Sequence, residues 1–190
     1  MLHSAISYEI RGTRALNNAD WSTAAAQFRQ GLALEPSNPT LRHKLGTALY
    51  QLGEVRAAQQ AFEEVIRESP EYARAHYSLG ILLESDGRHQ EAIERFSAAV
   101  AHDPEYVEAR VRLAGLLRRS GRLRQAVTHY EHVLAIDPRI AEAAFGHAMA
   151  LVRLEQYQEA RERLREGARV HREEPVFAHA LARLLAAVPD

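Results

Sequence analysis

Two histidines three positions apart come closest, by residue type and spacing, to forming a chemical site in this chain. His129 and His132 would share one face of a helix, so both could bind the same metal ion. Two ligands make a weak site, and the sequence places no third ligand beside them. We therefore interpret them as exposed histidines on either side of Glu131, and we predict no metal and no cofactor.

Catalytic motifs are absent from the chain. It contains no HExxH, no GxSxG and no GxxxxGK. Acidic pairs such as Glu63-Glu64 and Glu173-Glu174 are interpreted as solvated helix faces. His147 falls at an apolar position, which predicts a hydrogen-bonded core histidine and not a catalyst. We predict that the protein is not an enzyme and has no catalytic residues.

Composition excludes several other classes of protein. The 190 residues are 46% hydrophobic and carry a net charge of −1, so nothing draws the chain as a whole to nucleic acid or to an anionic membrane. Its arginines alternate with acids, and no 18-residue apolar run is present, so we predict neither nucleic-acid binding nor membrane insertion. The lack of cysteine and of a signal-peptide pattern favours the cytoplasm. Lys44 is the only lysine, which we interpret as the coding bias of a bacterial genome.

An internal repeat of 34 residues organises the chain. Each unit has two helical apolar patterns, separated by a break such as Ser85-Asp86-Gly87 and followed in four units by a proline. The predicted units are residues 5–38, 39–72, 73–106, 107–140 and 141–174. One more helical segment, at about 175–188, is expected to cap the last unit. We predict one domain over residues 1–190, because such repeats contact only their neighbours.

The residues at fixed positions of the units carry a resemblance to a known family. A small residue stands in the first helical pattern of every unit: Gly12, Gly46, Gly80, Ala114 and Ala148. The second pattern has an alanine followed four residues later by a large residue, which is Phe28, Phe62, Phe96, Tyr130 or Leu164. This pattern resembles the tetratricopeptide repeat family. The resemblance implies an all-α fold, a right-handed α-solenoid or superhelix of antiparallel helix hairpins.

The family's geometry also implies where a partner would bind. Its first helices line a concave groove that usually binds a peptide or a short helix. Transferred to this chain, the apolar groove positions are Tyr77, Ile81, Val111, Phe145, Met149 and Val152. The arginines expected around them are Arg74, Arg112, Arg118, Arg119 and Arg153. The lysine–asparagine clamp of the chaperone-tail readers is missing, because its positions hold residues such as His43 and Thr47.

We expect a non-catalytic scaffold whose concave groove binds a partner protein or peptide through two or three apolar side chains and nearby acids. On this hypothesis Phe145→Glu should abolish partner capture while helicity stays normal. Three alternatives stay open. The capping helix, or a second copy of the chain, could cover the apolar groove residues. The chain could assemble with itself as a homo-oligomer through its terminal helix, or it could be the accessory arm of a larger enzyme such as a transferase.

Overall fold

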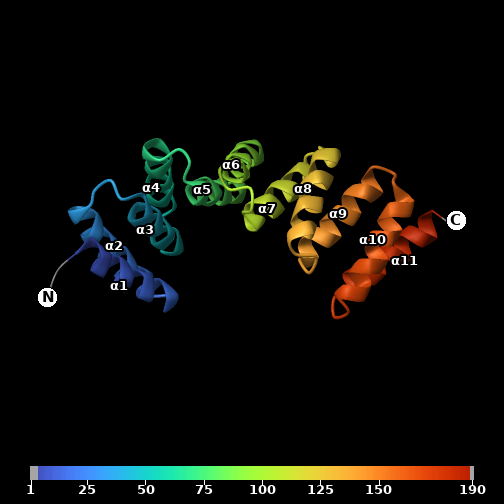
Figure 1. The fold of residues 1–190 in the computed structure, drawn as a ribbon, viewed down its shortest axis with the longest axis horizontal. Helices are drawn as coiled ribbons and strands as arrows, with labels where there is room; N and C mark the ends of the chain where they lie inside the picture. Colours follow the sequence, from blue (N-terminus) through green and yellow to red (C-terminus); the bar gives the residue numbers. More distant parts are fainter. Residues whose placement is uncertain (1–3, 189–190) are drawn as a thin grey trace. The chain divides into compact units, whose positions relative to one another are not determined.

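The computed structural model describes residues 4–188, and within them it contains eleven α-helices and no strand, confirming the all-α prediction (Figure 1). The first helices of the hairpins are α1 (Ala5–Asn17), α3 (Pro39–Gln51), α5 (Ala73–Ser85), α7 (Val107–Arg119) and α9 (Ala141–Arg153). The second helices are α2 (Trp21–Leu34), α4 (Val55–Glu68), α6 (His89–His102), α8 (Leu123–Ile136) and α10 (Tyr157–Val170). The terminal helix α11 spans Val176–Ala187.

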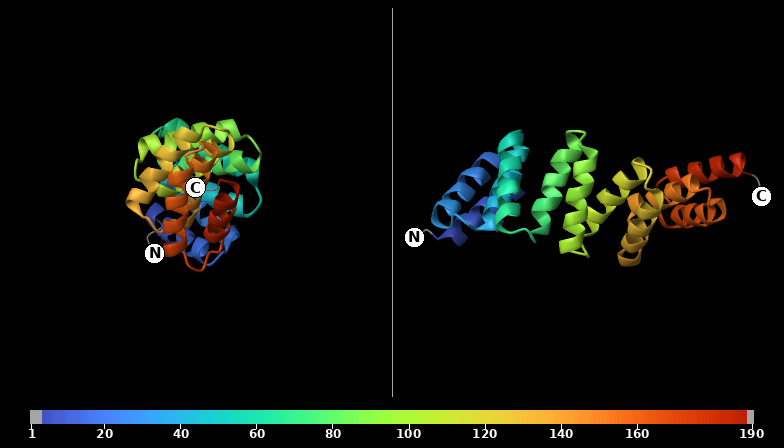
Figure 2. Two further views of the ribbon diagram at one scale, coloured as in Figure 1. Left: turned by 90° about the vertical axis from the view of Figure 1, so that its right-hand side faces the viewer. Right: turned by 90° about the horizontal axis from the view of Figure 1, so that it is seen from above.

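The helices divide between two compact units. Unit 1 extends to residue 104 and contains three hairpins, α1 to α6. Unit 2 starts at residue 105 and contains two hairpins, α7 to α10, together with α11. Figure 2 shows the ribbon from two further directions. The two helices of each hairpin pack side by side, because each presents one apolar face to the other.

The turn inside every hairpin has the same backbone geometry. The residue at its centre has a positive φ, which is +80° at Gly53, +76° at Gly87 and +84° at Gly121. Glycine adopts this conformation without strain, whereas other residues incur a steric penalty. The first and last turns use Ala19, at 56°, and Glu155, at 63°. These two breaks are the ones without glycine in the sequence.

Side chains cap the N-termini of α2 and α3 in unit 1. Asp20 accepts a hydrogen bond from the Thr23 amide at 3.1 Å, and Asn38 accepts one from the Leu41 amide at 3.0 Å. Each side chain pairs a backbone N–H that the first helical turn would leave unpaired. The hydrogen bonds of Asp20 also hold the pKa of its carboxyl below the usual value.

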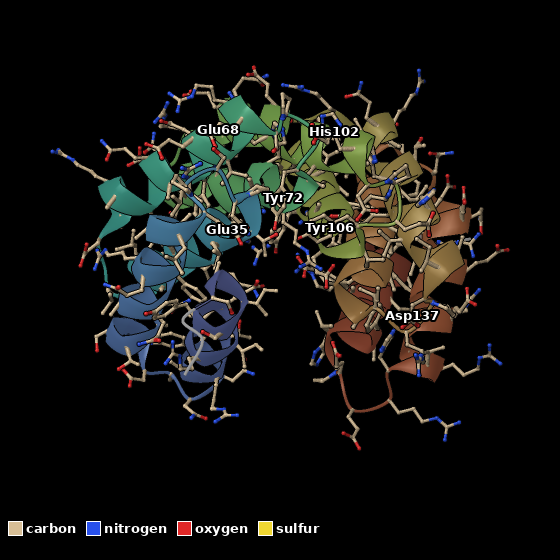
Figure 3. All side chains as sticks on the ribbon, turned by 60° about the vertical axis from the view of Figure 1, so that its left-hand side comes forward. Glu35, Glu68, Tyr72, His102, Tyr106 and Asp137 are labelled. Atoms are coloured by element: carbon tan, nitrogen blue, oxygen red, sulfur yellow. The ribbon has the colours of Figure 1, made fainter. Side chains whose placement is uncertain are left out.

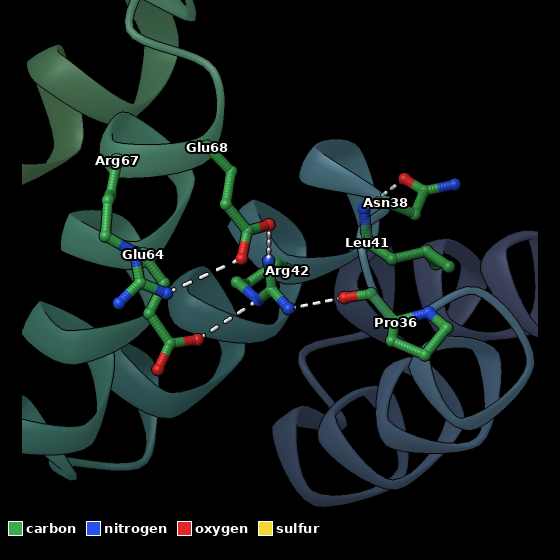
Figure 4. A network of polar contacts seen from close by, with 7 residues as sticks. All are labelled: Pro36, Asn38, Leu41, Arg42, Glu64, Arg67 and Glu68. Carbon is green, nitrogen blue, oxygen red and sulfur yellow. Dashed lines mark hydrogen bonds and ion pairs between the residues drawn. The ribbon is translucent and has the colours of Figure 1, made fainter.

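Arg42 joins the two helices of the second hairpin to the loop before them (Figure 4). Its guanidinium lies 3.1 Å from the Glu64 carboxylate, and it also pairs with Glu68 and donates to the Pro36 carbonyl. Only 14% of the Arg42 side chain is exposed, so these contacts are screened less than a surface ion pair would be. Figure 3 labels Glu35, Glu68, Tyr72, His102, Tyr106 and Asp137, which lie near the ends of helices where successive hairpins join.

Hairpins of unit 1 are packed by a phenylalanine lying on a glycine. The Phe28 ring covers Gly12, Phe62 covers Gly46 and Phe96 covers Gly80, so closely that a Cβ at any of these glycines would lie 2.5–2.7 Å from a ring carbon. In unit 2 the corresponding small residue of α7 is Ala114, and the large residue of α8 is Tyr130. Tyr130 instead lies on Gly146 of α9, so it joins two successive hairpins.

Candidate partner-binding site

A groove of about 400 Å³ lies between α9 and α11 in unit 2. We call it the α9–α11 groove. Its lining residues are Phe145, Met149, Val152, Val176, His179, Ala180, Arg183, Leu184 and Ala187. Three of them, Phe145, Met149 and Val152, are among the residues that the sequence predicted. All three are half-buried and pack against the apolar core of this end of the unit.

The groove exists because α11 is anchored beside α9 and does not close over it. Phe177 of α11 is fully buried, and its ring covers Gly167 of α10 so closely that a Cβ there would lie 2.2 Å from a ring carbon. The Phe145 ring meets Phe177 edge-on, with 5.6 Å between ring centroids. The expected capping helix therefore contacts Phe145 and forms one wall of the groove. A glutamate at position 145 would disturb this packing, so Phe145→Glu does not test binding alone.

The polar side chains that line the groove are basic. Arg183 and His179 line it from α11, and none of its lining residues is acidic. Arg153 follows Val152 and is exposed, and its guanidinium donates to the Arg118 carbonyl at 2.5 Å. This contact holds Arg153 against the end of α7. Apolar walls with basic residues suit a ligand that combines apolar and acidic side chains.

The other predicted site residues lie elsewhere. Val111 is buried, with 6% of its surface exposed, which leaves little of it for a partner to contact. It faces the core because the α7 segment around it is buried on nearly every side. Arg112 and Arg119 are exposed on α7, while Arg118 is half-buried.

Three predicted residues lie on α5 in unit 1. Tyr77 and Ile81 are half-buried, and the Tyr77 ring lies 5.7 Å from Phe96, centroid to centroid. Arg74 is exposed. The structure therefore brings Phe145, Met149 and Val152 together in one groove of unit 2. Tyr77, Ile81 and Arg74 belong to unit 1 and are not part of that groove.

Sequence reasoning raised the possibility that the capping helix covers the apolar groove residues, but it missed that α11 forms a second wall of an open groove. Val176, Ala180, Leu184 and Ala187 recur at the spacing of one helix face. That spacing is visible in the sequence, and it could have indicated a second apolar wall. The segment was instead expected to cover an apolar end, which accounts for only part of its apolar surface.

His43 occupies a register position that family geometry assigns to the groove, yet its ring packs inside unit 1. The ring lies 5.4 Å from Phe62 and 5.5 Å from Tyr72, and one ring nitrogen is 2.9 Å from the Ser78 hydroxyl. Burial lowers the pKa of His43 to about 4, with Arg74 and Lys44 adding to the effect. The imidazole is therefore neutral near pH 7.

The histidines of unit 2 differ from the prediction. His129 and His132 are half-buried and not exposed, and burial lowers the pKa of His129. His132 lies 3.8 Å from Glu105. His147 is buried as predicted, but within residues 4–188 neither of its ring nitrogens has a hydrogen-bond partner. An unpaired buried polar group costs about 1–3 kcal/mol of stability.

None of the described helices combines the length and apolar character that a membrane crossing requires.

Comparisons with known proteins agree with the repeat pattern. Two models described as tetratricopeptide repeat match the chain, one over residues 11–53 and 43–106 and the other over residues 83–139 and 117–184. No curated protein gives a significant sequence match.

Solved structures share the fold at low sequence identity. YrrB, described as a TPR protein with an unusual peptide-binding site, is 23% identical with a TM-score of 0.76, over 93% of this chain and 91% of that one. PilF of Pseudomonas aeruginosa is 19% identical with a TM-score of 0.80, over 96% of this chain and 83% of that one. MamA is 21% identical with a TM-score of 0.75, over 89% and 92%.

Proposed function

Because the chain belongs to the tetratricopeptide repeat family, we propose that it is a non-catalytic scaffold that binds a short segment of a partner protein in the α9–α11 groove. Arrays of this kind present extended surfaces on which partners dock. YrrB, which has a similar fold, is described as having a peptide-binding site.

The observation that carries the proposal is the apolar lining of this groove between two helices. Phe145, Met149 and Val152 form one wall, and α11 forms the other with Val176, Ala180 and Leu184. Methionine and aromatic side chains adapt to different ligand shapes, which suits them to bind an apolar anchor. A partly open apolar surface of this kind is typical of a docking site.

We infer the chemistry of the partner from the same residues. The apolar walls suit a partner segment with two or three apolar side chains at helical or extended spacing. Arg183 and His179 favour an acidic residue beside those side chains. Burying each anchor contributes roughly 1.5–3 kcal/mol. Two or three anchors, after the costs of ordering the segment, support binding with a Kd on the order of micromolar.

Peptide selection followed by titration tests the proposal. A random peptide library is selected on the wild-type protein, and the selected peptide is titrated by fluorescence polarisation. We expect Arg183→Glu and Met149→Glu to weaken binding at least about tenfold, because one reverses the charge of the groove and the other places a charge in its wall. Arg165→Glu is the matched control, because Arg165 is exposed on α10 and lines none of the pockets described.

Circular dichroism of each variant separates loss of binding from loss of fold. Equal affinity in the wild type and both groove variants would overturn the assignment to this groove. Selection of segments from the chain's own sequence would instead favour self-association.

A further inference from the structure

Three side chains from three successive helices converge within unit 2. Glu131 of α8, His147 of α9 and Glu159 of α10 each offer one ligand atom, and these atoms lie within 4.8 Å of one another. The Nε2 atom of His147 is 3.9 Å from a Glu131 carboxylate oxygen. None of the three lines the α9–α11 groove, so this cluster is separate from the proposed binding site.

His147 gives the cluster its significance. Only 2% of its surface is exposed, and neither ring nitrogen has a hydrogen-bond partner among the described residues. Buried polar atoms are nearly always paired, so each exception calls for an explanation. A neutral imidazole has a lone pair on one of its ring nitrogens. A metal ion would bind that lone pair and so provide a partner for one of the two unpaired ring nitrogens.

We propose that Glu131, His147 and Glu159 bind a divalent transition-metal ion, of which Zn²⁺ is the best match. Zinc accepts imidazole nitrogen and carboxylate oxygen at roughly 2.0–2.2 Å in a tetrahedron, which sets ligand atoms about 3.4 Å apart. The three side chains reach that spacing by closing at most about 1.4 Å, which the exposed Glu131 side chain allows. Water would take the fourth position.

The ligand set discriminates between metals. Calcium and magnesium are bound by six or more oxygen atoms and do not favour imidazole, whereas zinc accepts a mixed nitrogen and oxygen set. Arg163 is the competing cation, 3.9 Å from Glu159 and 3.3 Å from Glu166. When Glu159 binds a metal ion, Arg163 keeps Glu166 as its ion-pair partner.

The repeat itself provides a comparison. Two repeats earlier, Glu63 of α4 and Glu91 of α6 occupy the positions of Glu131 and Glu159, but Leu79 takes the place of His147. The same pair of acids thus occurs with a leucine between them, and only at His147 does a histidine take that place. A bound ion would join α8, α9 and α10, and would hold together the helices that support the α9–α11 groove.

Zinc titration of the intact chain tests the site. Isothermal titration calorimetry with Zn²⁺ alone should give one tight site in the wild type, accompanied by a rise in the melting temperature followed by circular dichroism. His147→Leu, Glu131→Gln and Glu159→Gln should each weaken that site by more than about tenfold. His147→Leu should still fold, because leucine occupies this register in the second, third and fourth units.

Two further variants keep the test specific. Glu63→Gln combined with Glu91→Gln removes the equivalent acids beside Leu79 and should leave zinc binding unchanged. His129→Ala combined with His132→Ala removes the neighbouring histidine pair and should also leave it unchanged. Absence of a stoichiometric site in the wild type, or equal zinc affinity in His147→Leu, would overturn the proposal.

Discussion

At the scale of single residues, the size of one side chain sets the size allowed to its partner across a hairpin. Phe96 lies directly on Gly80, with no room for a Cβ. In the fifth unit the small residue is larger and the large residue is smaller: Ala148 and Leu164 stand at these positions, and both are fully buried. Close packing makes such pairs interdependent, because a well-packed core has little free volume.

Gly80→Ala should therefore destabilise unit 1. The new Cβ would lie 2.7 Å from the Phe96 ring, and overpacking of this kind costs about 1–3 kcal/mol. Phe96→Leu in the same chain should recover part of the loss, because it recreates the alanine–leucine pair of the fifth unit. Urea unfolding of the two single variants and the double variant measures the coupling energy.

Gly115→Ala is the control for this experiment. A Cβ at Gly115 meets its nearest atoms at 3.6 and 3.8 Å, which is ordinary contact. Alanine is favoured over glycine inside a helix by about 1 kcal/mol, so this change should stabilise the protein. Destabilisation by both alanines to the same extent would show that crowding on the aromatic ring is not the cause.

At the scale of elements, α11 is the last of the described helices, and its main neighbour is α10. Two contacts hold α11 in place. Phe177 packs on Gly167 of α10, and the buried guanidinium of Arg161 donates a hydrogen bond to the Val188 carbonyl. Arg161 is 1% exposed and reaches the end of α11 from α10. The position of α11, and with it the groove, depends on this contact.

Arg161→Met should loosen α11 while the hairpins before it stay folded. Methionine keeps the apolar bulk but cannot donate to Val188. Hydrogen exchange should show amides of α11 losing protection, while those of α8 keep it. Arg165→Met, on the exposed side of the same helix, should leave both unchanged. Equal protection of α11 in the two variants would contradict an anchoring role for Arg161.

At the scale of the molecule, acid should destabilise unit 1 through His43. Its pKa is about 4 in the folded protein, against 6.5 for the unfolded chain. Between these pH values the unfolded chain binds a proton at His43 that the folded chain does not. The contribution of His43 to the free energy of unfolding is therefore complete above pH 6.5 and decreases as the pH falls toward 4. The loss reaches at most about 3.5 kcal/mol, since a difference of one in pKa corresponds to about 1.4 kcal/mol.

Urea unfolding at pH 7.5 and pH 5 measures this loss. The fluorescence of Trp21, the only tryptophan, reports on the α1–α2 hairpin in the same unit. His43→Gln keeps a polar group near Ser78 but has no proton to gain, so its stability should change less between the two pH values. His76, whose pKa is also lowered by burial, should leave some pH dependence in that variant. An unchanged pH dependence in His43→Gln would contradict the assignment.

The sequence by itself determined the repeated local structure. The helices α1, α3, α5, α7 and α9 begin at residues 5, 39, 73, 107 and 141, where the repeat units begin. Helical periodicity, the turn residues and the prolines act over a few residues, so they can be read without a structure.

Contacts between helices were decided only by the tertiary structure. The sequence indicated Phe145, Met149 and Val152, but not the α11 wall opposite them. It indicated that His147 is buried, but not that Glu131 and Glu159 lie beside it. The physical reason is that a pattern along one helix fixes which face is apolar, whereas the residues facing it depend on how neighbouring helices cross and on how their side chains interlock.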